Sequence, residues 1–208
     1  TVRRVYTNKL IRITGEGYEP KGEFIAGKGE ALEPSRDEHL KLLMRAGVLC
    51  NNAHLEDGRG WRVIGDATEG TLLVLAGKAG MWQDDLKKSY PLLAELPFSS
   101  ERKRMTTIHK SGKKKLAYVK GAPEVVLGLC ARVYSNGKER KMTRADKEKI
   151  LKINNGMAAD ALRVLAFERF GRELRDGILI DRDERVKSLC LALGAVRARE
   201  HFEDHHHQ

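Results

Sequence analysis

Apolar positions along the chain follow two spacings, one typical of strands and one typical of helices. Val5, Ile11 and Ile13 alternate loosely near the N-terminus, which predicts strand over residues 2–13. Apolar residues then recur every three or four positions from Leu40 to Val48, which predicts one face of an amphipathic helix. Because Ser35-Arg-Asp-Glu38 has the spacing of a capping box, we expect that helix to open there.

The central part of the chain predicts another helix and a hairpin. Trp61–Ile64 has the pattern of a short strand, and the leucine-rich run after Gly70 predicts a helix. The Pro91–Pro97 stretch predicts a break in regular structure. Met105–Lys110 and Lys115–Lys120 are strand-like segments joined by a short glycine-containing turn, so they predict a β-hairpin.

The C-terminal third mixes the same kinds of element. Asn136-Gly137 is a strong hairpin signal, and Thr143 is a suitable cap for a long helix. Strands are predicted at Arg163–Phe167 and over 187–196, with a charged loop over 171–186. Since no regular β-α-β-α alternation is visible, we predict an α+β fold with a largely antiparallel, twisted sheet flanked by helices.

Length and composition indicate one globular domain. The 208 residues are 41% apolar and 33% charged, which is enough for a substantial core. The longest apolar run, near Leu189–Val196, is far shorter than the roughly 20 residues of a membrane-spanning helix, and no signal peptide is visible. We expect one domain over 1–197 and a tail over 198–208 whose His205–His207 run is partly tag-derived.

Charge and cysteine content narrow the possible classes. Lys and Arg number 39 against 29 Asp and Glu, so the net charge of +10 predicts an anionic partner: nucleic acid, nucleotide or membrane surface. Aromatic residues are only 6%, which disfavours the base-stacking surface of a single-strand binder. The three cysteines form no C-x-x-C pair, which argues against a disulfide framework or a zinc ribbon, and we expect Cys130 and Cys190 to be small core residues.

One glycine-rich motif resembles a phosphate-binding loop but lacks an essential part. Gly22–Gly29 nearly matches G-x-x-x-x-G-K-[ST], yet Gly29 stands where a magnesium-binding hydroxyl is needed. The sequence that follows, Glu30–Pro34, does not open a helix after a buried strand. We interpret the segment as a surface loop.

Four other segments carry a more specific signal. They are Gly65-Asp-Ala-Thr-Glu-Gly70, Pro97-Phe-Ser-Ser-Glu-Arg-Lys-Arg-Met105, Tyr118-Val-Lys-Gly-Ala-Pro-Glu124 and Leu162-Arg-Val-Leu-Ala-Phe167. In order and spacing they resemble the nucleotide-binding (N) domain of P-type ATPases, most closely the type II cation pumps that include the calcium ATPases. The resemblance spans roughly residues 5–197 and implies an N-domain-like fold, ATP as ligand and a role in an ATP-driven ion translocase.

Phe98 is the candidate adenine platform. An aromatic face that stacks on a base is worth about 1–3 kcal/mol in nucleic-acid binding. An isolated phenylalanine is more often a core residue, and the resemblance favours the binding role. It also implies contacts from Ser100 and Lys103, although calcium pumps often have arginine in place of Ser100 and a run such as Arg102–Arg104 is usually a solvated face.

Lys120 and Gly121 form a second implied contact. A glycine lets a ligand approach the backbone closely, and a lysine supplies a compact positive charge. Without a ligand, Lys120 would be an ordinary edge-strand lysine. Pro123 and Glu124 are assigned instead to the start of a helix, where proline fits the first position and glutamate the positive end.

Arg163, Leu165 and Glu69 complete the implied binding set. Arg163 lies at the entry to a strand, where a guanidinium can reach phosphate oxygens, and Leu165 faces the same side. The resemblance implies that Glu69 accepts a hydrogen bond from the adenine amino group. Asp66 and Glu69 also have the spacing of a plain helix start, so we assign Asp66 to capping with a partial contribution to binding.

Motifs that the chain lacks bear on its expected role. It contains neither the Asp-Lys-Thr-Gly-Thr motif of the phosphorylated aspartate nor the actuator Thr-Gly-Glu-Ser loop. The resemblance therefore implies an excised cytoplasmic domain of an integral membrane pump, which meets the membrane only through a missing transmembrane region. It would bind ATP without turning it over, and would supply no catalytic residue and no metal ligand. Mg²⁺ would be held mainly by the phosphates and the absent domain, and the partners would be the phosphorylation and actuator domains.

Two alternatives to ATP binding stay open at this point. The basic clusters Arg102–Arg104 and Lys113–Lys115 could bind the phosphates of a nucleic acid, with a steep salt dependence. The chain could also be an interaction domain that binds neither ligand. Calcium is the first expectation for the transported ion, with sodium, potassium and protons as alternatives.

Overall fold

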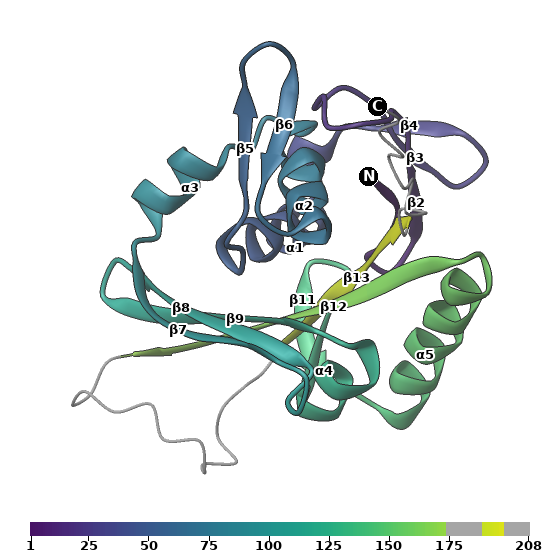
Figure 1. The fold of residues 1–208 in the computed structure, drawn as a ribbon. Coiled ribbons are helices and arrows are strands. Elements are labelled where there is room, and N and C mark those ends of the chain that lie inside the picture. Colours follow the sequence, from purple (N-terminus) through teal and green to yellow (C-terminus); the bar gives the residue numbers. More distant parts are fainter. Residues whose placement is uncertain (174–188, 198–208) are drawn as a thin grey trace.

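The computed structural model describes residues 1–173 and 189–197, and shows a large sheet with helices packed on both faces (Figure 1). The helices of this part are α1 (Glu38–Leu49), α2 (Ala67–Gly77), α3 (Gln83–Ser89), α4 (Pro123–Leu129) and α5 (Arg144–Ala159), with a 3-10 turn, η1, at Pro34–Arg36. The strands are β1 (Val2–Tyr6), β2 (Leu10–Ile13), β3 (Phe24–Ala26), β4 (Glu30–Leu32), β5 (His54–Asp57), β6 (Trp61–Ile64), β7 (Leu92–Ser99), β8 (Arg104–Ser111), β9 (Lys114–Gly121), β10 (Arg132–Ser135), β11 (Lys138–Lys141), β12 (Leu162–Glu173) and β13 (Leu189–Arg197). The predicted tail over 198–208 lies outside the described residues.

The sheet is almost entirely antiparallel, as predicted. Its main path runs β4-β3-β2-β1-β13-β12-β9-β8-β7. β10 joins the sheet by pairing with β13, and β11 pairs with β10. Among the described strands only the β10–β13 pair is parallel. β5 and β6 form a separate ribbon. The last strand of the chain therefore lies in the middle of the sheet, between β1 and β12, and the predicted α+β class is confirmed.

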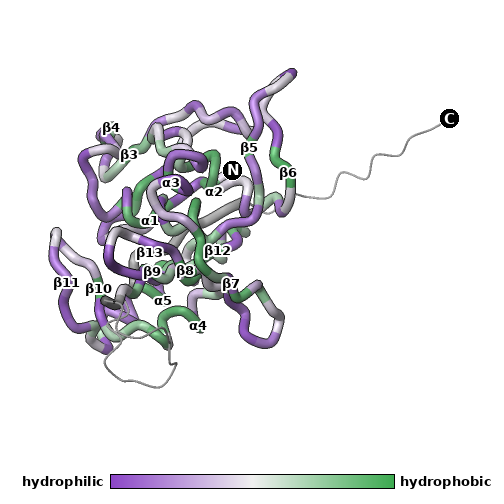
Figure 2. Tube along the Cα trace, turned by 90° about the vertical axis from the view of Figure 1, so that its left-hand side faces the viewer, coloured by the Kyte–Doolittle hydropathy of each residue, from purple (hydrophilic) through white to green (hydrophobic). Residues whose placement is uncertain are grey.

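Two apolar clusters fill the two faces of the sheet. One packs α1 and α2 against the face that carries Met105, Tyr118 and Phe167. The other packs α4 and α5 against the face that carries Val119 and Ala166. Because successive strand residues point to opposite faces, the neighbours Ala166 and Phe167 belong to different clusters. Figure 2 shows hydrophobic colouring along α4 and hydrophilic colouring along β11, whose residues are all exposed.

The start of α1 differs from the sequence prediction. Asp37 is the N-cap, and its carboxylate accepts a hydrogen bond from the Leu40 N–H at 3.0 Å. Ser35 lies one turn earlier, in η1, where the Glu33 carboxylate accepts from its hydroxyl at 2.9 Å. The predicted capping box from Ser35 is therefore wrong, because the preceding Pro34 starts a separate 3-10 turn that uses Ser35.

Two further segments differ from the sequence prediction. Residues 2–13 form two strands, β1 and β2, joined by a tight turn at which Asn8 has a positive φ of 73°. The predicted break at Pro91–Pro97 is instead the edge strand β7. Proline is tolerated at an edge or a bulge, since no ladder hydrogen bond is lost there, and Pro97 lies within a register shift between Leu96 and Ser99.

The turns and the long C-terminal elements match the predictions more closely. β8 and β9 form the predicted hairpin, and Asn136 and Gly137 both have positive φ, at 50° and 77°, as a two-residue hairpin turn requires. β12 is longer than predicted and takes up residues 171–173, while the rest of the loop predicted over 171–186 lies outside the described residues. Cys130 is buried as predicted; the side chain of Cys190 lies outside the described part. None of the described helices is long and apolar enough to cross a membrane.

His109 is a buried titratable residue of the α1 face. It is 2% exposed, and its Nδ1 lies 2.9 Å from the Tyr90 carbonyl. Burial is the main reason why the pKa of His109 lies below its usual value, because desolvation disfavours the charged ring. As the pH falls from about 6.5 toward the lower pKa of the folded chain, the unfolded chain binds more protons than the folded chain, and the free energy of unfolding falls by up to about 1.4 kcal/mol per pH unit.

We expect His109→Gln to reduce the acid sensitivity of folding between pH 7 and pH 5. Urea unfolding at several pH values measures the slope of the free energy of unfolding against pH in each variant. His54→Gln is the matched control, because His54 is exposed on β5 and its loss should leave the slope unchanged. Equal slopes for the native chain and His109→Gln would contradict the prediction.

Candidate functional site

Glu69 and Lys120 form an ion pair where the first turn of α2 meets β9. The Lys120 Nζ lies 2.8 Å from Glu69 Oε1, and the two side chains are 7% and 17% exposed. β9 has β8 and β12 as neighbours, so Lys120 is not an edge-strand lysine. An ammonium at this depth needs a charged or hydrogen-bonding partner, and Glu69 is that partner.

Two asparagines that sequence analysis did not select hold Glu69 in place. The backbone N–H of Asn52 donates to Glu69 Oε2 at 2.7 Å. The buried Asn51 amide donates to the carbonyl of Glu69 and to that of Gly47, both at 2.9 Å, and so ties α2 to the end of α1. A carboxylate has about four lone-pair positions, so Glu69 keeps acceptor capacity for a further donor. The only sequence signal was a pair of polar residues directly after a predicted helix.

Asp66 caps α2, as the sequence predicts. Its carboxylate accepts from the Glu69 N–H at 2.9 Å, and its extended backbone precedes the first helical residue, Ala67. Asp66 itself is exposed. The cap fixes where α2 begins and therefore where the Glu69 side chain leaves the helix.

Strand register brings Phe98 to the same end of the sheet as Lys120. Ser99 pairs with Arg104, and Pro97 and Phe98 lie in the bulge opposite Met105, which pairs with Lys120. Two strand spacings, about 10 Å, therefore separate the backbones of Phe98 and Lys120. Phe98 is 56% exposed, so it is not a core residue, and its ring is available to a ligand.

The turn between β7 and β8 packs against Gly121. Lys103 has a positive φ of 51°, and its carbonyl accepts a hydrogen bond from the Ala122 N–H at 3.1 Å. Ser100 and Lys103 are both exposed in this turn. The backbone of the turn, rather than any side-chain contact, thus holds these two candidates beside the end of β9.

Arg163 and Leu165 reach the site from β12. The Arg163 Nη1 lies 3.4 Å from the Thr68 hydroxyl, which places an exposed guanidinium beside the first turn of α2. Leu165 is half-buried and packs against the α1–α2 cluster. Thr68, like Asn51 and Asn52, was not selected by sequence analysis, although it lies within the 65–70 motif.

Some cationic side chains of the site have a carboxylate partner and others do not. Lys120 is neutralised by Glu69, whereas neither Lys103 nor Arg163 has a carboxylate within ion-pair distance among the described residues. The Arg102 guanidinium donates to the backbone carbonyls of Leu96 and Pro97. The uncompensated cations favour an anionic ligand.

Cys50 lies beneath this site and is not a nucleophile. Burial raises the pKa of its thiol to about 11, and its Sγ contacts the carbonyl of Met105 at 3.6 Å. The thiol therefore stays protonated at neutral pH. Two cavities of the molecule, of about 200 and 660 Å³, are lined by none of the eight candidate residues.

The structure thus gathers the predicted residues at one end of the sheet. Lys120 pairs with Glu69, Arg163 contacts the adjacent Thr68 in the first turn of α2, and strand register brings Gly121 and Phe98 to the same end of the sheet. The arrangement offers an exposed aromatic face, a carboxylate with spare acceptor capacity and two uncompensated cations. Such a set can bind a planar heterocycle that carries a polyanionic tail.

Comparison with known proteins identifies related sequences. The family described as "P-type ATPase, cytoplasmic domain N" matches residues 39–174. A "Calcium-transporting ATPase" of Bacillus subtilis is 36% identical over 171 residues, covering 80% of this chain and 19% of the relative. A "Probable cation-transporting ATPase F" of Mycobacterium bovis is 34% identical over 200 residues, covering 95% and 22%. A "Calcium-transporting ATPase type 2C member 1" of Bos taurus is 32% identical over 172 residues, covering 80% and 17%. The chain thus spans about a fifth of the length of these relatives.

Proposed function

Because the chain belongs to the family of P-type ATPase cytoplasmic N domains, we propose that it binds ATP at the end of strands β7–β9 and serves an ATP-driven cation pump. We assign residues 1–197 to this domain and 198–208 to a tail. The observation that carries the proposal is an exposed Phe98 beside a nearly buried Glu69–Lys120 pair. Calcium is the cation we propose, because two of the three relatives described above are named calcium-transporting.

The adenine ring would be held by stacking and one directed hydrogen bond. Phe98 provides the stacking face, and Glu69 accepts from the adenine amino group through a lone pair that Lys120 and Asn52 leave unused. Leu165 would provide apolar surface, and Gly121 lets the turn that carries Ser100 and Lys103 pack closely against the end of β9. A purine with an exocyclic amine fits this pairing better than one with an oxo group, whose acceptor would face the carboxylate.

The phosphates would be attracted by the cations at the rim of the site. Arg163 can bind phosphate oxygens with its planar guanidinium, and Lys103 adds a compact positive charge, with Ser100 in the same turn. Lys120, which is paired with Glu69, would act by fixing that carboxylate. Mg²⁺, when bound with ATP, would neutralise phosphate charge. No group of three or more His, Cys, Asp or Glu suitable for a metal ion occurs in the described part of the chain, so we assign it no ligand here.

The contribution of this domain to catalysis would be positional. It would hold ATP by the adenine end and direct the γ-phosphate toward an aspartate of a separate phosphorylation domain. Phosphoryl transfer depends mainly on alignment and charge neutralisation, so a binding domain can support it without a catalytic residue of its own. The proposed partners are accordingly the phosphorylation and actuator domains of the same cytoplasmic assembly.

Phe98→Ala tests this function directly. Titration with a fluorescent ATP analogue, displaced by ATP, should show saturable binding that Phe98→Ala weakens about tenfold, since stacking is worth about 1–3 kcal/mol. Leu92→Ala is the matched control, because Leu92 lies on the same strand, is 54% exposed and is distant from the Glu69–Lys120 pair along β7. Equal loss in both variants would contradict an adenine platform at Phe98.

A lysine pair separates a specific site from a general basic surface. Lys120→Ala should weaken ATP binding, whereas Lys114→Ala, six residues earlier on β9 and exposed, should not. Circular dichroism measures whether each variant is folded, and binding is compared only under conditions in which both are. Absence of ATP binding, together with DNA or RNA binding of steep salt dependence, would favour the nucleic-acid alternative instead.

A further inference from the structure

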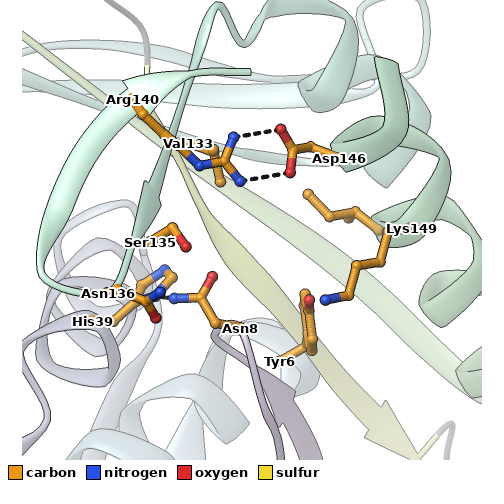
Figure 3. A pocket seen from close by; sticks show the side chains of 10 residues that line it. Tyr6, Asn8, His39, Val133, Ser135, Asn136, Arg140, Asp146 and Lys149 are labelled. Carbon is orange, nitrogen blue, oxygen red and sulfur yellow. Dashed lines mark hydrogen bonds and ion pairs between the residues drawn. The ribbon is translucent and has the colours of Figure 1, made fainter. Parts of the chain in front are cut away.

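A cavity remote from the Glu69–Lys120 pair has the chemistry of an anion site, and we propose that it binds a small molecule with an oxyanion headgroup, a phosphate or a carboxylate. The cavity of about 200 Å³ lies between the end of β1, the start of α1, the β10–β11 hairpin and α5 (Figure 3). Pockets for drug-sized ligands span about 300–1,000 Å³, so this one suits a smaller molecule. None of the residues proposed to bind ATP lines it.

Lys149 supplies the uncompensated positive charge of the cavity. Its side chain extends from α5 into the cavity with the nitrogen directed toward Tyr6 (Figure 3), and it forms no ion pair with any described residue. The nearby Arg140 is already committed, because its two terminal nitrogens donate to Asp146 at 2.6 and 2.7 Å. Of the Lys, Arg, Asp and Glu side chains that line the cavity, the exposed Lys149 therefore contributes a net charge of +1, because the Arg140–Asp146 pair is neutral overall; His39 also lines the cavity.

Asp146 does not compete for Lys149. Besides the two bonds from Arg140, its carboxylate accepts from the Thr143 backbone and hydroxyl at 2.8 and 2.7 Å. The Arg140 hydrogen bond is the main cause that holds the pKa of Asp146 well below its usual range. Because the lone pairs of this carboxylate are largely used, the Lys149 ammonium is left for a ligand.

Tyr6 adds a polar group that the described residues leave without a partner. The residue is only 8% exposed and packs in the α4–α5 cluster, yet its hydroxyl lines the cavity and has no hydrogen bond to a described residue. The hydroxyl can donate to a ligand atom at this point, and a neutral hydrogen bond of this kind is worth about 0.5–1.5 kcal/mol. Ser135 and Asn8 add neutral donors on the opposite wall.

The combination of groups selects the ligand class. A cation would be repelled by Lys149, and an apolar molecule would form no hydrogen bond with the ammonium or with the Tyr6 hydroxyl. An oxyanion can accept from Lys149, from Tyr6 and from the Ser135 hydroxyl at once, and charge-assisted bonds of this kind are the stronger ones. Phosphate and carboxylate headgroups share this chemistry, and the titration below distinguishes them.

Nuclear magnetic resonance titration of the 208-residue chain tests the proposal. Inorganic phosphate and, separately, acetate are added at constant ionic strength while the backbone amides of Tyr6, Asn8, Ser135 and Lys149 are followed. We expect saturable shifts at these positions, and the probe with the higher affinity identifies the headgroup. Lys149→Met should lower that affinity about tenfold or more, and Tyr6→Phe, which keeps the packing, about threefold, as expected for charged and neutral hydrogen bonds.

Lys147→Met is the matched control, because it removes the same charge from the same helix without lining the cavity. Its affinity for the probe should equal that of the native chain. Equal weakening by Lys147→Met and Lys149→Met, or no saturable shift with either probe, would overturn the proposal. Shifts confined to Phe98, Lys120 and Arg163 would mean that the probe occupies the site proposed for ATP, and would also overturn it, whereas a failure of ATP to bind would leave the cavity result unaffected.

Discussion

Lys120→Met should lower the free energy of unfolding by about 3–5 kcal/mol, as expected when one partner of a buried ion pair is removed. The Glu69 carboxylate, now 17% exposed, would keep the Asn52 N–H as its hydrogen-bond donor among the described residues. Methionine keeps the length and apolar stem of lysine, so the loss reports the charge rather than a cavity. Urea unfolding monitored by circular dichroism measures it.

A double variant separates the ion pair from other effects of the substitution. Lys120→Met combined with Glu69→Gln should be less destabilised than Lys120→Met alone, because the orphaned charge is gone. Arg144→Met is the control: Arg144 pairs with Glu148 on the surface of α5, with side chains 93% and 62% exposed. Such a pair is worth less than about 1 kcal/mol. Equal losses at the two sites would mean that the Glu69–Lys120 pair is not effectively buried.

Gly121→Ala should cost about 3 kcal/mol of unfolding free energy, the upper part of the range for overpacking. An added Cβ would lie 2.5 Å from the Lys103 carbonyl oxygen, 2.7 Å from the Arg104 Cβ and 2.9 Å from the Arg104 Cα. These atoms belong to backbone or lie next to it, so only a shift of the turn before β8 relieves the clash. Because that turn carries Ser100 and Lys103, ATP affinity should fall together with stability.

Gly128→Ala provides a control with the opposite sign. Gly128 lies inside α4, and nothing lies within 4 Å of the Cβ that alanine would add. Alanine is favoured over glycine in a helix interior by about 0.5–1 kcal/mol, so this variant should be slightly more stable than the native chain. Thermal unfolding of the two variants side by side gives the comparison. A stable Gly121→Ala would show that the turn before β8 yields easily.

The variants Lys120→Met and Gly121→Ala both test how the proposed site is built. Lys120 and Gly121 are adjacent in sequence, yet one contacts α2 and the other contacts the β7–β8 turn. The end of β9 therefore joins the two halves of the site. A substitution there is expected to change ATP binding through the placement of Glu69 on one side and of Lys103 on the other.

The sequence correctly predicted the caps and turns that depend only on residues a few positions apart. Asp66 and Thr143 cap their helices, and Asn136-Gly137 makes its hairpin, because the side chain or backbone geometry that decides each lies within a few residues. The predictions failed at Ser35 and at Pro91–Pro97. At Ser35 the preceding Pro34 starts a separate 3-10 turn, and at Pro91–Pro97 the expected break is an edge strand, because pairing with β8 decides the conformation there.

Sequence alone determined the α+β class, the family and the choice of Glu69, Phe98, Lys120 and Arg163 as candidates, because motifs and periodicity are properties of short segments. Only the tertiary structure decided that Asn51 and Asn52 hold Glu69, that Lys120 is a nearly buried partner in a central strand, and that Tyr6 and Lys149 share a cavity. Each of those contacts joins residues far apart in the chain. Their proximity depends on strand order and helix packing, which local spacing does not encode.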